Sequence, residues 1–445
     1  METILIKAAQ LILSLSILVI LHEFGHFLFA RGFKTRVEKF YLFFNPWFSL
    51  FKFKKGETEY GMGWLPLGGY VKIAGMIDES MDREAMKLPP KNWEFRSKPA
   101  WQRLFIMLGG IMMNFLFAMI IYIGVLYAWG EQYLPTENVK YGIVVNEVGK
   151  EIGFRTGDKI LTVDNKQIED FMKIIPTIVL DDARTVQVMR NGKVADVEIS
   201  DEDLSMMLKS KSVMSPRVPF RLGVDGFTED SPAKEAGLKT GDEIKGINGN
   251  TYKYYDQWVD AAKGHAGETV ILNIERDGQM LDIKMTIGED GMIGVKNSHY
   301  ADQYFDLKTV SYGFFESIPA GIQRGVQTTK DYLKQFKLFF RPETKAYESL
   351  GGFATIGNIF PEQWDWFSFW NMTAFISIIL AIMNLLPIPA LDGGHVMFLF
   401  FEMVTGKKPG ERFLEYAQIA GMIILLALVL FANANDIIKM INGTF

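Results

Sequence analysis

The sequence predicts a polytopic α-helical membrane protein with four transmembrane helices and two copies of a small β/α domain inserted between the second and third helices. Two observations predict this fold class. Four long apolar runs contain almost no charged residues, and the stretch between the second and third runs contains an internal repeat. Of 445 residues, 49% are hydrophobic and 22% are charged, so the class follows from how these residues are distributed rather than from the average.

The four apolar runs are long enough to cross a bilayer. Residues 8–30 would span roughly 35 Å as a helix, against a hydrocarbon core of roughly 30 Å. This run is too long for a signal peptide, and no small-x-small cleavage site follows it. The other runs cover residues 104–129, 367–389 and 417–432.

The distribution of Lys and Arg predicts the orientation of these helices. Basic residues are frequent between the first and second runs, and Lys407, Lys408 and Arg412 lie between the third and fourth. Cytoplasmic loops carry such an excess, so both loops should be cytoplasmic. The segment 130–366 and both termini should then face outward. We therefore expect a multi-pass membrane protein.

Charge and cysteine content exclude several other classes. The net charge of −5 argues against a nucleic-acid-binding protein. The chain has no cysteine, which excludes disulfide bonds and thiolate metal sites.

The internal repeat matches residues 153–160 to residues 237–244. Each copy is followed by a strand–turn–strand pattern, over residues 186–199 and 270–285. The turns would be Asn191-Gly192 and Asp277-Gly278, since such dipeptides favour the positive φ of tight hairpin turns. Each copy is therefore predicted to contain a β-hairpin.

The segment His22-Glu23-Phe24-Gly25-His26 gives the most specific chemical signal. The spacing of four residues places both imidazoles on one helical face, where they can bind Zn²⁺, and Glu23 can act as a general base. Polar groups inside an apolar span cost several kcal/mol unless they are paired or coordinated. The alternative is a polar cluster that is satisfied within a helix bundle.

A third ligand is needed, and Asp392 is the best candidate. Among the other histidines, His265 and His299 lie in the outer segment, and His395 follows Asp392 closely. Pro387 and Pro389 should interrupt the third span, because proline lacks an N–H and disfavours a helix.

Gly393 and Gly394 should then form a tight turn that presents Asp392 from a broken helix. By the charge-derived orientation, Asp392 and both histidines lie toward the cytoplasmic side. Three ligands with an open fourth position are typical of a catalytic zinc. The alternative is an ordinary end of the span, with Asp392 on the cytosolic surface.

The second repeat, over residues 230–250, resembles bacterial PDZ domains, and the first resembles them less because it is shorter before its Thr-Gly-Asp stretch. PDZ domains bind peptides by adding a strand to a sheet edge. This resemblance implies an edge strand at residues 222–227, with Leu222, Gly223 and Val224 as peptide-binding residues. The alternative is that the pair forms a rigid spacer.

Taken together, the first-span motif, the PDZ pair and the segment 384–395 resemble the site-2 intramembrane metalloproteases, in the bacterial regulator-of-sigma-E protease branch with tandem PDZ domains. The resemblance implies one Zn²⁺ per chain, held by His22, His26 and Asp392, with Glu23 as the base. It also implies substrate-binding roles for Asn384 and Pro387, although the Asn384 amide could equally form a helix–helix hydrogen bond.

Residues 65–73 resemble the membrane-reentrant β-loop of that family, which implies that Gly68 and Gly69 bind substrate. A cytosolic hairpin is the alternative.

The implied function is zinc-dependent cleavage of the transmembrane segments of single-pass proteins, such as trimmed anti-sigma factors or signal-peptide remnants. An upstream site-1-type protease is implied as well, and the lipid bilayer is the other partner. Two alternatives are a membrane-anchored PDZ scaffold without catalytic activity, and a different integral-membrane zinc protease whose third ligand is a glutamate on a later helix.

The sequence departs from the family pattern at two places. Phe43-Phe44-Asn45-Pro46 stands where Gly-Phe-Gly-Pro is frequent, and residues 108–114 contain Gly109-Gly110 where Gly-Pro is common. We expect both departures to affect only helix packing and loop shape.

The expected segments are the first transmembrane helix at 1–32, a cytoplasmic segment at 33–100 with the β-loop at about 56–75, the second transmembrane helix at 101–130, PDZ-like domains at 138–215 and 220–295, an outer-face and partly helical linker at 296–366, the third transmembrane helix at 367–391, a cytoplasmic loop at 392–416 and the fourth transmembrane helix at 417–434.

Overall fold

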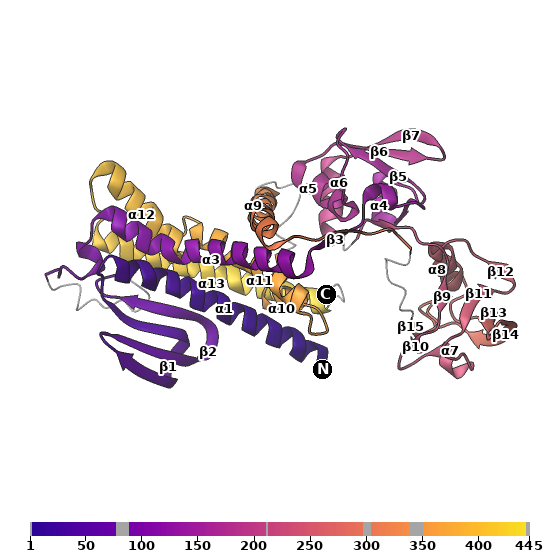
Figure 1. The fold of residues 1–445 in the computed structure, drawn as a ribbon, viewed down its shortest axis with the longest axis horizontal. Helices are drawn as coiled ribbons and strands as arrows, with labels where there is room; N and C mark the ends of the chain where they lie inside the picture. Colours follow the sequence, from indigo (N-terminus) through magenta and orange to yellow (C-terminus); the bar gives the residue numbers. More distant parts are fainter. Residues whose placement is uncertain (1, 77–88, 211, 297–303, 339–349, 442–445) are drawn as a thin grey trace. The chain divides into compact units, whose positions relative to one another are not determined.

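The computed structural model describes residues 2–76, 89–210, 212–296, 304–338 and 350–441, and the chain forms two compact units. The first unit contains the apolar helices together with a β-sheet. The second contains the repeated segment and spans residues 131–310 with a short later piece. Figure 1 traces both along the sequence.

Four helices of the first unit are long and apolar enough to cross a membrane, as predicted. They are α1 (Glu2–Gly32), α3 (Ala100–Trp129), α11 (Trp366–Leu385) and α13 (Glu411–Ile441). Helix α3 packs against both α1 and α11, and the long helices run side by side in Figure 1. Helix α13 exposes most of its apolar side chains, which is expected for a helix that faces lipid.

The third span ends where the prolines predict, since α11 stops at Leu385. The expected cytoplasmic loop at 392–416 contains helix α12 (Asp392–Thr405), which begins directly at Asp392. Gly393 and Gly394 form its first turn rather than a tight turn. A Cβ at Gly393 would lie 2.2 Å from the Leu386 oxygen, so glycine lets this turn pack against the unwound segment 386–391.

The β-sheet of the first unit is larger than predicted. It consists of β1 (Val37–Lys55) and β2 (Thr58–Ile73), and it packs beside α1 (Figure 1). Residues 37–44 pair with residues 65–73 on one side and with 59–62 on the other, whereas residues 49–55 pair with 58–63. Residues 65–73 therefore form an outer strand.

The sequence pattern missed β1 because the strand is kinked. Phe43 and Trp47 have φ values of 64° and 73°, in the left-handed region that bulky residues rarely adopt. These kinks break the alternation by which a strand is recognised. At the second kink Trp47 is 90% exposed, and Phe48, Leu50, Phe51 and Phe53 after it are also exposed.

The second unit contains the two repeats. The first comprises β4 (Ile143–Val145), α4 (Glu147–Ile152), β5 (Lys159–Val163), α5 (Ile174–Asp181), β6 (Thr185–Arg190), β7 (Lys193–Glu198), α6 (Asp201–Lys209) and β8 (Met214–Pro216). The second comprises β9 (Leu222–Gly223), β10 (Gly226–Phe227), α7 (Pro232–Glu235), β11 (Glu243–Ile247), β12 (Asn250–Thr251), α8 (Tyr255–Gly264), β13 (Thr269–Arg276), β14 (Gln279–Thr286) and β15 (Val295–Lys296). Each repeat has its own hydrophobic core.

Both predicted hairpins are present. Strands β6 and β7 close with the pair Arg190–Lys193, and β13 and β14 close with Arg276–Gln279. The turn residues have positive φ, between 50° and 77°, as Asn-Gly and Asp-Gly turns require.

A buried ion pair recurs at equivalent places in the two repeats. Arg190 donates two hydrogen bonds to Asp158, and Arg276 donates two to Asp242. Arg190 also donates to the carbonyl oxygen of Gly153, and Arg276 donates to that of the equivalent Gly237. The hydrogen bond from Arg276 holds the pKa of the Asp242 carboxyl below its usual value. The same contact therefore ties each hairpin to its Thr-Gly-Asp loop.

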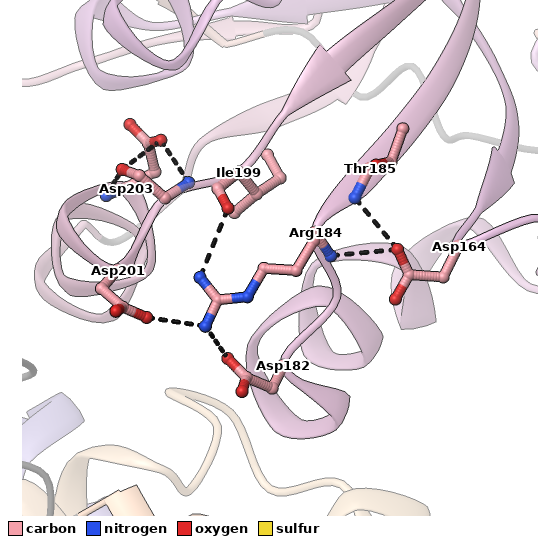
Figure 2. A network of polar contacts seen from close by, with 8 residues as sticks. Asp164, Asp182, Arg184, Thr185, Ile199, Asp201 and Asp203 are labelled. Atoms are coloured by element: carbon pink, nitrogen blue, oxygen red, sulfur yellow. Dashed lines mark hydrogen bonds and ion pairs between the residues drawn. The ribbon is translucent and has the colours of Figure 1, made fainter.

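The first repeat carries a further polar network, shown in Figure 2. The Arg184 guanidinium contacts Asp182 at 2.8 Å and Asp201 at 2.7 Å. Asp164 accepts from the backbone N–H groups of Arg184 and Thr185. These contacts join the end of α5, the start of β6 and the start of α6, so their role is local.

The expected edge strand at residues 222–227 is interrupted. It consists of β9, which pairs with β11, and β10, which pairs with β15. The side chains of Leu222 and Val224 are 3% and 1% exposed and belong to the core of the repeat. Their peptide-binding role stays a prediction, and at these two positions it would depend on the main chain.

The expected partly helical linker at 296–366 contains helix α9 (Phe314–Leu338), and residues 297–303 and 339–349 of this linker lie outside the described residues. Gly321 and Gly325 of α9 lie against Ile123 and Met119 of α3. Arg324 donates to the Asn371 side chain on α11. Helix α9 therefore packs on the apolar helices. The short helix α10 (Phe353–Asn358) and the strand pair β3 (Glu131–Tyr133) and β16 (Lys308–Val310) complete the fold.

Candidate metal centre

Three side chains from two distant parts of the sequence converge at one point. His22 and His26 are four residues apart, so both lie on the same face of α1. Their Nε2 atoms lie 3.2 Å apart. Asp392, the first residue of α12, places its Oδ2 atom 3.1 Å from His22 Nε2 and 3.3 Å from His26 Nε2. Within the part of the chain that the structure describes, these three residues form the one cluster suited to a metal ion.

The triangle fits a zinc ion. Bonds of about 2.0–2.1 Å in tetrahedral geometry separate the ligand atoms by about 3.3 Å, which matches the three distances. Asp392 Oδ2 is buried and accepts no hydrogen bond from any described residue, which is costly for a carboxylate oxygen unless a cation binds it. The donor set of two imidazoles and one carboxylate is one that zinc accepts, and it leaves a fourth position.

Helix α3 closes one side of the cluster by an unusually close approach to α1. A Cβ at Gly110 would lie 2.5 Å from His26 Nε2 and 2.6 Å from His22 Cε1. Only glycine leaves room for both imidazoles at this position. The expectation that the departure at Gly109-Gly110 concerns helix packing alone was therefore wrong, because this segment contacts both histidines.

Two groups of α3 contact the outer nitrogens of the histidines. His26 Nδ1 lies 2.8 Å from the carbonyl oxygen of Ile106, and His22 Nδ1 lies 3.3 Å from the side-chain amide of Asn114. Sequence reasoning did not identify either group. A buried asparagine in an apolar span was the available signal.

A cavity of about 360 Å³ opens beside the cluster. Glu23 lines it together with the three cluster residues. The outer strand of the sheet forms another wall through residues 69–73, and Phe44 of β1 adds to it. A Cβ at Gly69 would lie 2.8 Å from Val19 and 3.5 Å from Glu23 Cγ, so a glycine here lets the strand approach α1. Because Phe44 belongs to the second departure, at residues 43–46, this departure also contributes to the wall of the cavity.

The other predicted residues lie in different places. Asn384 is half-buried in the last turn of α11 and Pro387 is exposed in the unwound segment, and neither is among the described residues that line the cavity. Gly68 precedes the lining strand residues and has a φ of 141°. His395, which was not proposed, lines the cavity one turn after Asp392.

Of the remaining histidines, His265 lies in the second repeat and contacts Glu268 at 2.7 Å. His299 lies outside the described residues. The geometry thus places the sequence-predicted zinc ligands and Glu23 at one cavity.

Comparison with known proteins gives matches along nearly the whole chain. The profile of peptidase family M50 matches residues 10–428. The "Regulator of sigma E protease" of Haemophilus influenzae is 28% identical over 96% of this chain and 98% of its own. The "Protease RseP" of Yersinia pestis is 28% identical over 98% of this chain and 99% of its own. A relative from Pasteurella multocida, 29% identical over 97% of this chain and 98% of its own, carries the words zinc metalloprotease in its name.

Proposed function

The chain belongs to peptidase family M50 and is a zinc metalloprotease of the membrane, and we propose that it cuts peptide bonds within the transmembrane segments of single-pass proteins. One observation carries this proposal: the His22, His26 and Asp392 triangle stands at a cavity that is lined by residues of the apolar helices and of an outer β-strand. A peptidase with this arrangement is suited to substrates that reach it through the bilayer.

We assign the zinc ligands as His22 Nε2, His26 Nε2 and Asp392 Oδ2. When bound there, zinc supplies Lewis acidity, which makes a water molecule more acidic and a peptide carbonyl more electrophilic. Glu23 lines the same cavity and is the general base. Its carboxylate takes a proton from the attacking water and returns it to the leaving amine.

The outer strand at residues 65–73 would hold the substrate. The amide of a helical substrate is already hydrogen-bonded within its helix and sterically closed, so the substrate must unwind before it is cut. An unwound segment can pair with the outer strand of a sheet, which replaces some of the lost hydrogen bonds. In this proposal Gly68 and Gly69 allow the close approach of the strand, and Asn384 and Pro387 help to position the substrate from the end of α11.

The sheet itself would enter the membrane. The residues Trp47, Phe48, Leu50, Phe51 and Phe53 are exposed, and so many exposed large apolar groups on one sheet are unusual where a protein faces water. Their exposure would be favourable in lipid and unfavourable in water, so it supports a membrane-reentrant β-loop rather than a cytosolic hairpin.

The orientation follows from the charged loops: the zinc cluster lies toward the cytoplasm, and the two repeats lie on the outer face of the inner membrane. In this proposal the repeats are PDZ-like domains that act as a size filter, which admits substrates already trimmed outside. Trimmed anti-sigma factors and signal-peptide remnants fit this description, with a site-1-type protease acting first. The filter requires exclusion of bulky domains and no strong peptide affinity.

The proposal is tested with the full-length protein in proteoliposomes that contain single-pass model substrates. Mass spectrometry of the fragments should place the cut within the transmembrane segment, and a zinc chelator should stop it. Cuts confined to the aqueous flanks of the substrate would contradict intramembrane cleavage. A protein that binds zinc but cuts no substrate with an apolar segment would contradict the proposal as well.

A further inference from the structure

The two histidines of the cluster must present the same nitrogen to a metal ion. Their Nε2 atoms converge with Asp392 Oδ2, so both Nε2 atoms must carry lone pairs and both Nδ1 atoms must carry hydrogens. What fixes this tautomer is the group that faces each Nδ1 atom.

For His26 the main chain fixes the tautomer. Its Nδ1 lies 2.8 Å from the carbonyl oxygen of Ile106, and a carbonyl oxygen can only accept a hydrogen bond. His26 Nδ1–H therefore donates, and Nε2 is left with its lone pair.

For His22 the facing group is a side-chain amide, which has both an acceptor and a donor end. The amide nitrogen of Asn114, Nδ2, is placed 3.3 Å from His22 Nδ1, and Asn114 is fully buried. If the amide nitrogen donated to Nδ1, the hydrogen of His22 would be on Nε2, pointing into the cluster. The amide oxygen, Oδ1, has no hydrogen-bond partner among the described residues. Turning the amide by 180° about its terminal bond gives Oδ1 a donor and gives His22 the tautomer that binds a metal.

We propose that Asn114 is a positioning residue for the zinc site: its Oδ1 accepts a hydrogen bond from His22 Nδ1–H and holds the His22 Nε2 lone pair toward the metal. The inference rests on the proposed zinc ligands. Ile106 and Asn114 then each accept a hydrogen bond from a histidine Nδ1–H. Ile106 does so through its main-chain carbonyl, and Asn114 through its side chain. Of the two, Asn114 alone can be changed by substitution.

A purely structural role for Asn114 makes a different prediction. Asn114 also accepts a hydrogen bond from Ser377 Oγ through its main-chain carbonyl at 2.8 Å, which ties α3 to α11. Every variant at position 114 keeps this main-chain hydrogen bond. If the Asn114 side chain merely packed between helices, its substitution would lower the stability of the zinc-free protein and leave zinc affinity unchanged. Ser377→Ala is the matched control, because it disturbs the same neighbourhood without changing the Asn114 side chain.

Two substitutions separate acceptor from donor. Asn114→Leu removes both functions at similar volume, whereas Asn114→Asp keeps an acceptor and removes the donor. A carboxylate that accepts from a zinc-bound histidine is common in zinc sites. We therefore expect Asn114→Asp to keep the site and Asn114→Leu to weaken it. The reverse assignment, in which the amide donates to Nδ1, expects both variants to lose the same interaction.

The experiment measures the apparent zinc dissociation constant of the purified full-length protein by competition with a chromogenic chelator. Asn114→Leu should weaken binding by roughly tenfold to a hundredfold, whereas Asn114→Asp and Ser377→Ala should stay within about threefold of the wild type. Wild-type affinity in Asn114→Leu, or an equal loss in the Leu and Asp variants, would overturn the inference. If the Leu variant does not fold, the comparison of Asp with the wild type decides by itself.

His22→Ala is included to separate this inference from the proposed function. Undiminished zinc binding by His22→Ala would mean that the ligand assignment is wrong. Loss of binding in His22→Ala, with no loss in Asn114→Leu, would contradict the role of Asn114 alone.

Discussion

Gly25 of α1 and Gly109 of α3 lie in main-chain contact. A Cβ at Gly25 would lie 2.2 Å from the Gly109 oxygen, and a Cβ at Gly109 would lie 2.6 Å from the Gly25 oxygen. Paired glycines let two membrane helices approach more closely than any side chain allows. This contact brings the next residue, Gly110, against the imidazoles of His22 and His26, so the glycines of α3 shape the metal cluster.

The first prediction concerns Gly110. In Gly110→Ala the new methyl group would overlap His26 Nε2, so the imidazole must move away from the position that the cluster requires. Displacement of a reacting group by about 1 Å can cost about a hundredfold in rate. We expect a loss of that order in peptidase activity and weaker zinc binding, measured on the purified protein.

Gly124 provides the matched control in the same helix. A Cβ at Gly124 meets no described atom within 4 Å, so Gly124→Ala should keep both properties. Equal behaviour of the two variants would show that the close approach at Gly110 does not matter.

The second prediction concerns the third ligand. Asp392→Ala should lower zinc affinity by more than about a hundredfold, because loss of a direct ligand exceeds the tenfold to hundredfold effect of an outer-shell group. Metal content after dialysis measures this. Asp365→Ala is the control, since Asp365 also stands at the start of a helix and accepts from the Ser368 N–H. Full zinc content in Asp392→Ala would place the third ligand elsewhere.

The cluster of His22, His26 and Asp392 could be predicted from the sequence because short local patterns indicate each of its members. His22 and His26 are one helical turn apart, and Asp392 follows a pair of prolines that had to interrupt a helix. The roles of Gly110 and Asn114 were not predictable in this way, since they depend on how closely α3 approaches α1. The four apolar helices followed from length and hydropathy.

The main errors lie where local rules conflict with packing. Gly393 and Gly394 favoured a turn, yet they begin α12 because their missing side chains admit the unwound segment. Strand β1 was missed because Phe43 and Trp47 adopt positive φ, which breaks its alternation. The hairpins of the repeats were found because Asn191-Gly192 and Asp277-Gly278 carry the turn chemistry in two residues.

The third prediction tests the membrane orientation. Cysteines introduced at Lys91 and Lys407 should react with a membrane-impermeant reagent only from the cytoplasmic side, because both lie in the basic loops. Cysteines at Lys193 and Lys439 should react from outside intact cells. The chain has no native cysteine, so the background is clean. Labelling of position 91 from outside would contradict the four-helix orientation.

The fourth prediction concerns the two repeats as a filter. Replacing residues 140–288 with a flexible linker should keep peptidase activity and extend it to substrates with intact outer domains, because the excluding bulk is gone. Gly223→Tyr, in β9, should have a smaller effect than the deletion. Cleavage of paired long and trimmed substrates measures both.

Peptide capture by the repeats would give the opposite pattern. Gly223→Tyr alone would then stop cleavage of trimmed substrates. If the deletion variant leaves long substrates uncut, the filter is wrong.

The most direct test of the account is the Glu23→Gln variant, measured for both zinc content and cleavage of a transmembrane substrate. The amide cannot accept a proton, whereas His22, His26 and Asp392 remain, so zinc should stay bound while the cleavage rate falls by about 10²–10⁴-fold. Glu362→Gln, at an exposed carboxylate 3.7 Å from Lys7, should retain wild-type activity. Cleavage near the wild-type rate by zinc-loaded Glu23→Gln would contradict the assignment of Glu23 as the base in this metalloprotease.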